Sequence, residues 1–264
     1  MLWLTIFFLV PMGFLGYQSL ESGLFPHFHF SWEFSNFSSA LSGYHTQLIR
    51  SFVYAGIATV ACLVLAYPLV YWIAFRAGPW RNLFLLIIVA PFFVTYLVRT
   101  LAWLNILADE GPVVRILRDI HVLAPDGRLL ATTFAVIAGI TYNFFPFMAL
   151  PLYVSLEQID ARLLEAAKDL YSSPTQAFLR VTLPLSAPGI VAGTLLTFIP
   201  AAGDFVNAYY LGSTQTQMIG NVVQNQFLVQ ANYPAAAALS FVFMVIVMII
   251  VIVYGRLLGT EDLV

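Results

Sequence analysis

Long stretches of the chain hold almost no charged side chains, and they predict helices that cross a membrane. Five stretches hold at most one Asp, Glu, Lys or Arg: 1–20, 51–75, 82–108, 129–156 and 181–255. The single charges are Arg99 in the third stretch and Asp204 in the fifth. Roughly 20 apolar residues cross the hydrocarbon core, so the last stretch fits two helices separated by the polar segment 212–233. The pattern therefore predicts six spans, at about 1–20, 48–75, 82–108, 131–155, 188–211 and 233–257.

Composition excludes a water-soluble protein. Hydrophobic residues make up 61% of the 264 residues and charged residues 9%, against about 45–50% and about 25% in soluble proteins. We expect an all-α polytopic membrane protein, with one transmembrane domain over 1–264 and its core over 48–257. The net charge is −2 without a basic cluster, which argues against nucleic-acid binding. Cys62 is the single cysteine, so the chain forms no internal disulfide.

The ends of the chain and its short loops predict an orientation. No Lys or Arg precedes the first apolar run and no clear cleavage site follows it, so we expect a membrane span there rather than a signal peptide. Basic residues gather in cytoplasmic loops. With both termini inside, six basic residues face the cytoplasm (Arg76, Arg81, Arg162, Lys168, Arg180 and Arg256). Four lie outside (Arg50, Arg115, Arg118 and Arg128).

The polar segment 156–185 predicts two short helices on the cytoplasmic side. Apolar residues recur at helical spacing in its first half: Leu156, Ile159, Leu163, Ala167 and Leu170. Ser173 suits an N-cap, Pro174 the first helical position, and Gln176 completes a capping box. Pro184 and then Pro188 are expected to end the second helix. Four acidic residues accompany three basic ones, which favours docking to a soluble partner over a connector lying on anionic headgroups.

A family resemblance begins in this segment. Glu165-Ala166-Ala167 and the run 178–189 resemble the EAA motif of ABC-importer permeases. The resemblance implies a type I importer permease in which this loop seats in a separate ATPase subunit. The residues it assigns to ATPase coupling are Glu165, Ala166, Ala167, Asp169, Tyr171, Phe178 and Arg180. Tyr171 stands where the family usually has glycine, and a tyrosine is strained in a left-handed turn.

The resemblance extends from about residue 30 to the end of the chain. Segments similar to spermidine/putrescine-type permeases are 91–103, 145–153, 203–206, 211–212, 218–221, 226–227 and 233–234. It implies a bacterial inner-membrane location, a heterodimer with a second permease, two ATPase subunits and an extracytoplasmic binding protein. No G-x-x-x-x-G-K-[ST] loop is present, so ATP and Mg are expected on the ATPase and no cofactor on this chain.

Polar residues inside the predicted spans are candidates for the cargo pathway. An aspartate at a helix centre costs about 2.5–3.5 kcal/mol, so Asp204 needs a cargo, a wet cavity or a structural partner such as an Arg or a helix N-terminus. Asn207 lies one turn on and Tyr210 less than two turns on. Aromatic rings beside a carboxylate suit an organic cation.

Span four adds Tyr142 and Asn143, which serve either the pathway or hydrogen bonding between helices. For Arg99 we expect a gating or structural ion pair, or a side chain that reaches the interface, rather than cargo contact, because its charge repels a cation.

Three functions remain in competition. The first is a polyamine importer permease, and the second keeps that architecture but imports another small solute, such as a metal chelate, a vitamin or an amine. The third, an intramembrane enzyme, is disfavoured because Asp204 is the only acid inside the last two spans and the histidines lie outside the spans. We expect no catalytic residue and no metal site. His27 and His29 belong with their aromatic neighbours to an interfacial belt.

Overall fold

The computed structural model describes residues 3, 5–160, 162–163, 165–166 and 173–257. Up to the polar segment, the elements are η1 (Thr5–Leu9), α2 (Val10–Ser19), β1 (Glu21–Leu24), β2 (His27–Phe30), α3 (Ser35–Arg76), η2 (Gly78–Trp80), α4 (Arg81–Val89), η3 (Ala90–Phe93), α5 (Tyr96–Leu107), α6 (Pro112–Asp119) and α7 (Thr133–Glu157). After it come α9 (Pro174–Ala177), η4 (Phe178–Thr182), α10 (Leu183–Leu185), α11 (Ala187–Ala202), α12 (Val206–Tyr210), η5 (Thr214–Thr216), α13 (Ile219–Gln224), η6 (Asn225–Val229) and α14 (Tyr233–Leu257).

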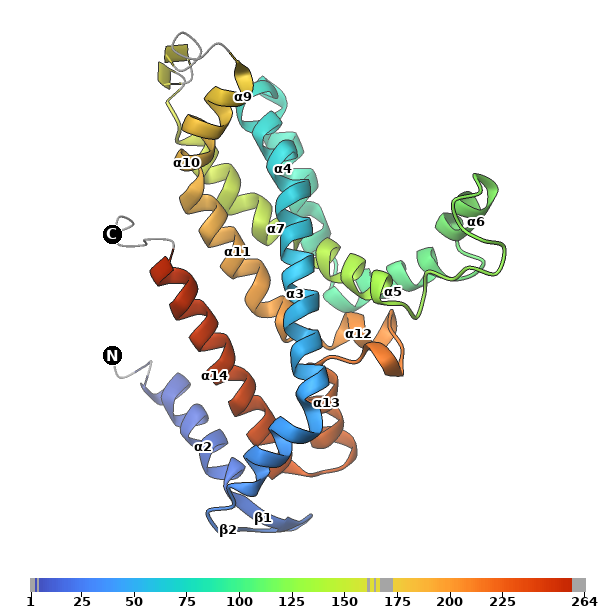
Figure 1. The fold of residues 1–264 in the computed structure, drawn as a ribbon, viewed down its shortest axis with the longest axis vertical. Helices are drawn as coiled ribbons and strands as arrows, with labels where there is room; N and C mark the ends of the chain where they lie inside the picture. Colours follow the sequence, from blue (N-terminus) through green and yellow to red (C-terminus); the bar gives the residue numbers. More distant parts are fainter. Residues whose placement is uncertain (1–2, 4, 161, 164, 167–172, 258–264) are drawn as a thin grey trace.

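Helices α3, α7 and α11 form the centre of the molecule (Figure 1). Their core consists of small and branched side chains, among them Ala66 and Val70 of α3 and Leu152 of α7. Gly189 and Gly193 let α11 approach α7 closely. A Cβ at Gly189 would lie 2.5 Å from the Ser155 Cβ, and one at Gly193 would lie 2.8 Å from the Met148 sulfur. Small residues at such a contact are typical of helix packing in membranes.

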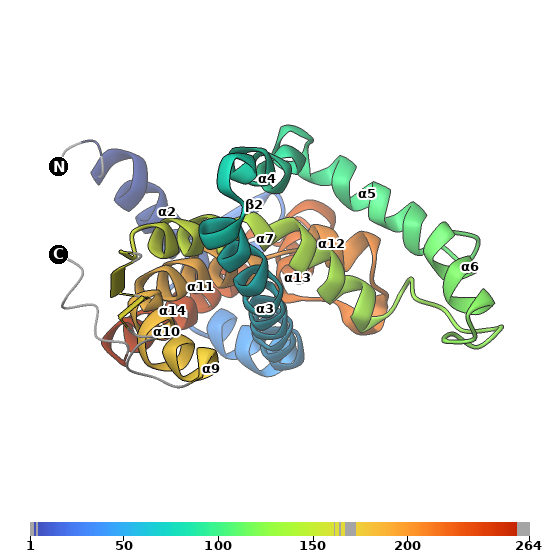
Figure 2. The ribbon, with the colours of Figure 1, turned by 90° about the horizontal axis from the view of Figure 1, so that it is seen from above.

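The third expected span is not one continuous helix. The segment before residue 94 and the helices after it, α5 and α6, meet at 96°. Pro91 lies in the last helical turn before the bend, and the backbone at Val94 and Thr95 is extended. As a result α5 and α6 project away from the central helices as an arm (Figures 1 and 2).

The fifth expected span also ends early. Helix α11 stops at Ala202, and the chain is non-helical at 203–205 before the short α12 begins. Three helices within the described part of the chain, α3, α7 and α14, have the length and apolar composition of a span, and two bent helix pairs raise that number to five. The described α2 with η1 corresponds to the first expected span.

A β-hairpin follows α2, which the all-α expectation did not include. Strands β1 and β2 are antiparallel, with Glu21 opposite Phe30 and Leu24 opposite His27. The Ser22 hydroxyl lies 3.1 Å from the His29 Nε2. In Figure 1 this hairpin lies at the end of the molecule opposite α9 and α10.

The second half of the polar segment begins as expected. The Ser173 hydroxyl accepts a hydrogen bond from the Gln176 backbone N–H at 3.3 Å, and Pro174 occupies the first helical position. The helical run ends at Leu185, between the two prolines expected to end it, and the chain bends by 62° at Ser186 into α11. Pro184 fits within this run because α10 begins at Leu183 and the first turn of a helix needs no N–H from it.

Candidate functional site

Asp204 does not lie within a helix, which corrects the expectation of an aspartate at the centre of a span. It lies in the break at 203–205 between α11 and α12 and is only 6% exposed. Two contacts from α13 fix the backbone of this break. The Asn221 side-chain amide donates to the Phe205 carbonyl at 2.8 Å, and Gly220 lies so close that a Cβ there would be 2.7 Å from the Gly203 carbonyl oxygen.

The Asp204 carboxylate accepts hydrogen bonds from four neutral donors. The Oδ1 atom accepts from the Tyr96 hydroxyl at 2.9 Å and from the Val206 N–H at 3.0 Å. The Oδ2 atom accepts from the Asn207 side-chain amide at 2.8 Å and its backbone N–H at 3.3 Å. The first turn of α12 therefore meets the carboxylate, which is the helix N-terminus alternative that the sequence left open. These donors satisfy the lone pairs but supply no positive charge.

A buried polar network extends from Asp204 into two other helices. The network consists of Tyr96 and Thr100 of α5, Asn143 of α7, Asp204 and Asn207. The Asn207 side-chain amide also donates to the Tyr96 hydroxyl at 2.6 Å. The Asn207 side-chain oxygen accepts from the Thr100 hydroxyl at 3.3 Å and from the Asn143 amide at 3.2 Å. The network therefore connects α5, α7 and α12 where the two broken spans meet.

Arg99 lies beside this network without an acidic partner. None of the three ion pairs between described residues includes it. Its guanidinium carbon lies 5.1 Å from the centre of the Phe92 ring and 5.6 Å from that of the Tyr96 ring. The side chain is 8% exposed, and its Nε and Nη1 atoms are buried without a hydrogen-bond partner. Cation–π contacts return about 0.5–2 kcal/mol each, whereas a buried unpaired charge costs on the order of several kcal/mol.

The two tyrosines expected in the pathway lie outside the network. Tyr210 packs on Tyr209 with ring centres 5.0 Å apart. Tyr142 packs on Trp103 at 5.4 Å and lines an apolar cavity of about 590 Å³ between α3, α4, α5 and α7. Conversely, Tyr96 and Thr100 belong to the network although neither was expected as a site residue from the sequence. Their spacing around Arg99 on one helix face was the available signal.

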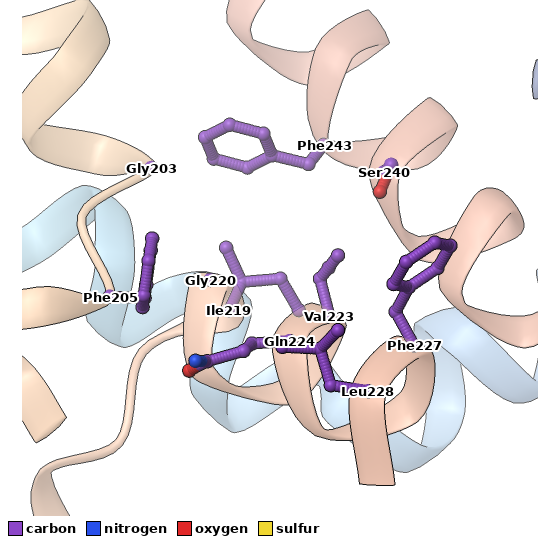
Figure 3. Close-up of a pocket in the computed structure, with 10 residues that line it drawn as sticks. All are labelled: Gly203, Phe205, Ile219, Gly220, Val223, Gln224, Phe227, Leu228, Ser240 and Phe243. Carbon is purple, nitrogen blue, oxygen red and sulfur yellow. The ribbon is translucent and has the colours of Figure 1, made fainter. Parts of the chain in front are cut away.

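An apolar cavity of about 390 Å³ borders the break (Figure 3). It is bounded by the break itself and by α13, η6 and α14. The rings of Phe205, Phe227 and Phe243 surround it, and Gln224 and Ser240 are the polar side chains that line it. The two neighbours of Asp204 in the break, Gly203 and Phe205, therefore line an apolar cavity, whereas Asp204 itself does not line it.

The residues expected to couple to an ATPase fall into three groups. Phe178 packs into the protein, with its ring 5.5 Å from Tyr67 and 5.9 Å from Tyr71 of α3. Glu165, Ala166 and Arg180 are exposed, and the first two are helical. The remaining three, Ala167, Asp169 and Tyr171, lie outside the described residues.

Comparison with known proteins identifies relatives over most of the chain. The profile of the family described as "Binding-protein-dependent transport system inner membrane component" matches residues 44–258. The "Spermidine/putrescine transport system permease protein PotB" of Haemophilus influenzae is 36% identical over 256 residues, which cover 96% of this chain and 90% of that protein. The protein of the same name from Escherichia coli is 38% identical over 213 residues, with 81% and 78% covered.

Solved structures share the fold at low sequence identity. The chain aligns with a bacterial ABC transporter "involved in the import of the acidic polysaccharide alginate" at a TM-score of 0.71 and 18% identity, covering 97% of this chain and 91% of that one. The alginate transporter in complex with its "alginate pentasaccharide-bound periplasmic protein" aligns at 0.73 and 16% identity, with 98% and 91% covered. At this identity the likeness concerns the fold alone.

Proposed function

Because the chain belongs to the family of binding-protein-dependent transport system inner membrane components, we propose that it is a permease subunit of an ATP-driven importer for polyamines such as spermidine and putrescine. The names of the two relatives at 36% and 38% identity support this cargo. In the structure, the observation that carries the proposal is the buried Asp204 carboxylate, which is hydrogen-bonded but has no counter-ion among the described residues.

The chemistry of a polyamine matches the surroundings of this carboxylate. A polyamine alternates ammonium groups with short methylene chains, so it needs a negative charge and apolar or aromatic surface close together. Asp204 supplies the charge, and the phenylalanine-lined cavity beside the break supplies the apolar surface. Asn207 and Asn143 supply polar contacts from the same network. We also assign Tyr210 and Tyr142, which lie outside the network, to the proposed pathway.

Coupling to an ATPase follows from the way the polar segment is attached. Phe178 packs on α3, and the Ser186 hydroxyl lies 2.7 Å from the Tyr67 hydroxyl, so the segment and α3 move together. From Ser186 the chain continues as α11, which ends immediately before Asp204. When ATP closes an ATPase dimer, movement of the 156–185 segment tilts α11 and shifts Asp204 against α5.

The complete transporter is proposed to contain more chains than this one. They are a second permease in a heterodimer, two ATPase subunits that bind ATP and Mg, and an extracytoplasmic binding protein. The exposed apolar side chains of the α5–α6 arm, such as Leu97, Val98 and Ile116, favour cover by lipid or by the second permease. The proposed chain crosses the bacterial inner membrane six times with both termini in the cytoplasm, and it binds no cofactor itself.

Replacement of Asp204 by asparagine tests the cargo role. In a strain without other polyamine uptake, Asp204→Asn is expected to reduce the kcat/KM for radiolabelled spermidine at least tenfold, about 1.4 kcal/mol, because the amide loses the charge and keeps one acceptor oxygen in place of two. Asp126→Asn, in an exposed loop, serves as the matched control and should leave uptake unchanged. Equal amounts of both variants must reach the membrane with the ATPase bound.

Two outcomes would contradict the proposal in different ways. Unchanged uptake kinetics in Asp204→Asn would remove Asp204 from the pathway and leave its bond to α12 as its role. Absence of spermidine and putrescine uptake by the wild-type complex would contradict the polyamine cargo and favour the alternative, a permease of the same architecture that imports another small solute.

A further inference from the structure

The rings of Phe92 and Tyr96 form a seat for a cation, which we call the aromatic seat. Phe92 lies in η3 just before the 96° bend and Tyr96 begins α5 just after it, so the bend brings both rings to one place. The guanidinium of Arg99 occupies the seat, 5.1 Å and 5.6 Å from the two ring centres. Faces of aromatic rings attract primary and quaternary ammonium groups as they attract guanidinium.

Arg99 is held in this seat by the rings and not by specific polar contacts. Its Nε and Nη1 atoms are buried and have no hydrogen-bond partner, and no ion pair among the described residues includes it. A structural arginine normally directs its forked donors at a carboxylate or at carbonyl oxygens. The seat therefore stabilises a guanidinium poorly, because its Nε and Nη1 groups stay without acceptors. A cation with fewer N–H groups to satisfy can replace it.

The seat and the Asp204 carboxylate share one residue. The Tyr96 ring forms one wall of the seat, and the hydroxyl of the same ring donates to the Asp204 Oδ1 at 2.9 Å. The Tyr96 side chain thus lies between the seat and the only acidic side chain in the polar network, and Arg99, which occupies the seat, forms no ion pair with that carboxylate. A free ammonium group is not tethered to α5 as Arg99 is, so it can contact the ring faces and also approach this negative charge.

We propose that Arg99 is a tethered occupant of the aromatic seat, and that an ammonium group of the cargo displaces it to bind beside Asp204. This inference rests on the proposed function and deepens it, because it names where one cargo charge binds and what competes for that position. Arg99 thereby lowers the affinity of the open site. Weakly bound cations fail to displace it, which makes it a specificity-determining residue.

The affinity for spermidine tests this competition. The assembled transporter, with both permeases and both ATPases, is placed in nanodiscs and its dissociation constant for radiolabelled spermidine is measured. Arg99→Met removes the tethered cation and is expected to lower the dissociation constant about tenfold, which corresponds to a seat that is free for about a tenth of the time in the wild type. Arg115→Met, on the exposed α6, is the control and should bind as the wild type does.

A second background separates competition for the seat from a simple loss of positive charge. In Phe92→Leu the seat loses one ring, so adding Arg99→Met to it should change the dissociation constant less than about twofold. A tenfold gain that persists in the Phe92→Leu background would show a long-range charge effect and overturn the proposal. An unchanged or higher dissociation constant in Arg99→Met would overturn it directly. Should that variant fail to assemble, Arg99→Gln replaces it with the same expected results.

The failure of this inference can be told apart from the failure of the proposed function. Suppose that the wild-type transporter binds spermidine and that Asp204→Asn weakens binding, but that Arg99→Met does not strengthen it. The proposed function then stands, and the inference that Arg99 competes with the cargo is wrong. If the wild-type transporter binds no spermidine, both are wrong.

Discussion

At the scale of single residues, the carboxylate oxygens of Asp204 are fully hydrogen-bonded, but no positive charge neutralises them among the described residues. Four N–H and O–H donors surround its carboxylate, and hydrogen bonds to a charged group contribute about 1.5–3 kcal/mol each. That is enough to keep the side chain buried at the break. The negative charge nevertheless remains without a counter-ion among the described residues, so a cation that reaches the break gains an interaction that the protein itself does not provide.

The Tyr96 hydroxyl is expected to contribute to both stability and transport. Tyr96→Phe keeps the ring but removes the donor to Asp204 and the acceptor for the Asn207 amide. The variant should lose about 1.5–3 kcal/mol of stability, seen as a lower unfolding temperature of the purified protein in detergent, and spermidine uptake should fall less than in Asp204→Asn. Tyr209→Phe, on an exposed ring, should change neither quantity. An unaltered unfolding temperature in Tyr96→Phe would show that the hydrogen bond from Tyr96 to Asp204 does not stabilise the protein.

At the scale of elements, α11 connects the polar segment, where the ATPase is proposed to dock, to the break that contains Asp204. It begins after the 62° bend at Ser186 and ends at Ala202, next to Asp204. Gly189 and Gly193 bring its backbone against α7, so α11 behaves as a rod on a close-packed surface. A displacement at its first turn is therefore transmitted to its last turn rather than absorbed by loose side chains.

The exposed Glu165 in the polar segment is expected to contact the ATPase. Glu165→Lys reverses a charge on a surface-exposed helical position and should reduce the amount of ATPase that copurifies with the permease at least tenfold, without lowering the permease in the membrane. Asp126→Lys makes the same change in charge in another exposed loop and should copurify normally. A complex of wild-type strength with Glu165→Lys would contradict docking through this segment.

Helix positions were predictable from the sequence where the signal is local. The uncharged runs located α3, α7 and α14, because hydropathy depends on each residue's own side chain. Ser173 and Pro174 located the start of α9 for the same reason, since a cap is made within one turn. Asn207 was expected one turn from Asp204 and hydrogen-bonds to it, and the bond from Asn143 to Asn207 is the contact between helices that the sequence left open beside a pathway role.

The breaks in the helices depend on partners distant in the sequence. Opening the helix at Asp204 gives its carboxylate the N–H groups of α12, but the arrangement is completed by Tyr96, which precedes it by 108 residues. Tyr96 reaches it only because the chain bends near Pro91. A proline and a glycine in the sequence permit such bends without requiring them, so the bend could not be predicted. The helix face that Tyr96 shares with Arg99 marks it as a candidate but does not show that it reaches Asp204.

At the scale of the whole molecule, the two segments expected to lie outside the membrane, the hairpin and the polar segment, are at opposite ends of the long axis. The β1–β2 hairpin lies at one end and α9 and α10 lie at the other (Figure 1). The Asp204 break lies between them along α11 and α12, beside the projecting α5–α6 arm. This separation is consistent with the proposed function, in which a binding protein and an ATPase act on the chain from two sides of a membrane.

Accessibility of the two ends tests the orientation in which the polar segment faces the cytoplasm. Cys62 is the single cysteine and is buried, so a membrane-impermeant maleimide should label the wild-type protein little. His27→Cys, on the exposed hairpin, is expected to react in intact cells, and Thr175→Cys, on exposed α9, only after the membrane is opened. The two positions act as controls for each other, because equal labelling in opened membranes shows that both thiols are reactive. Labelling of Thr175→Cys in intact cells would place the segment outside, where no ATP is available, and would end the proposed coupling to an ATPase.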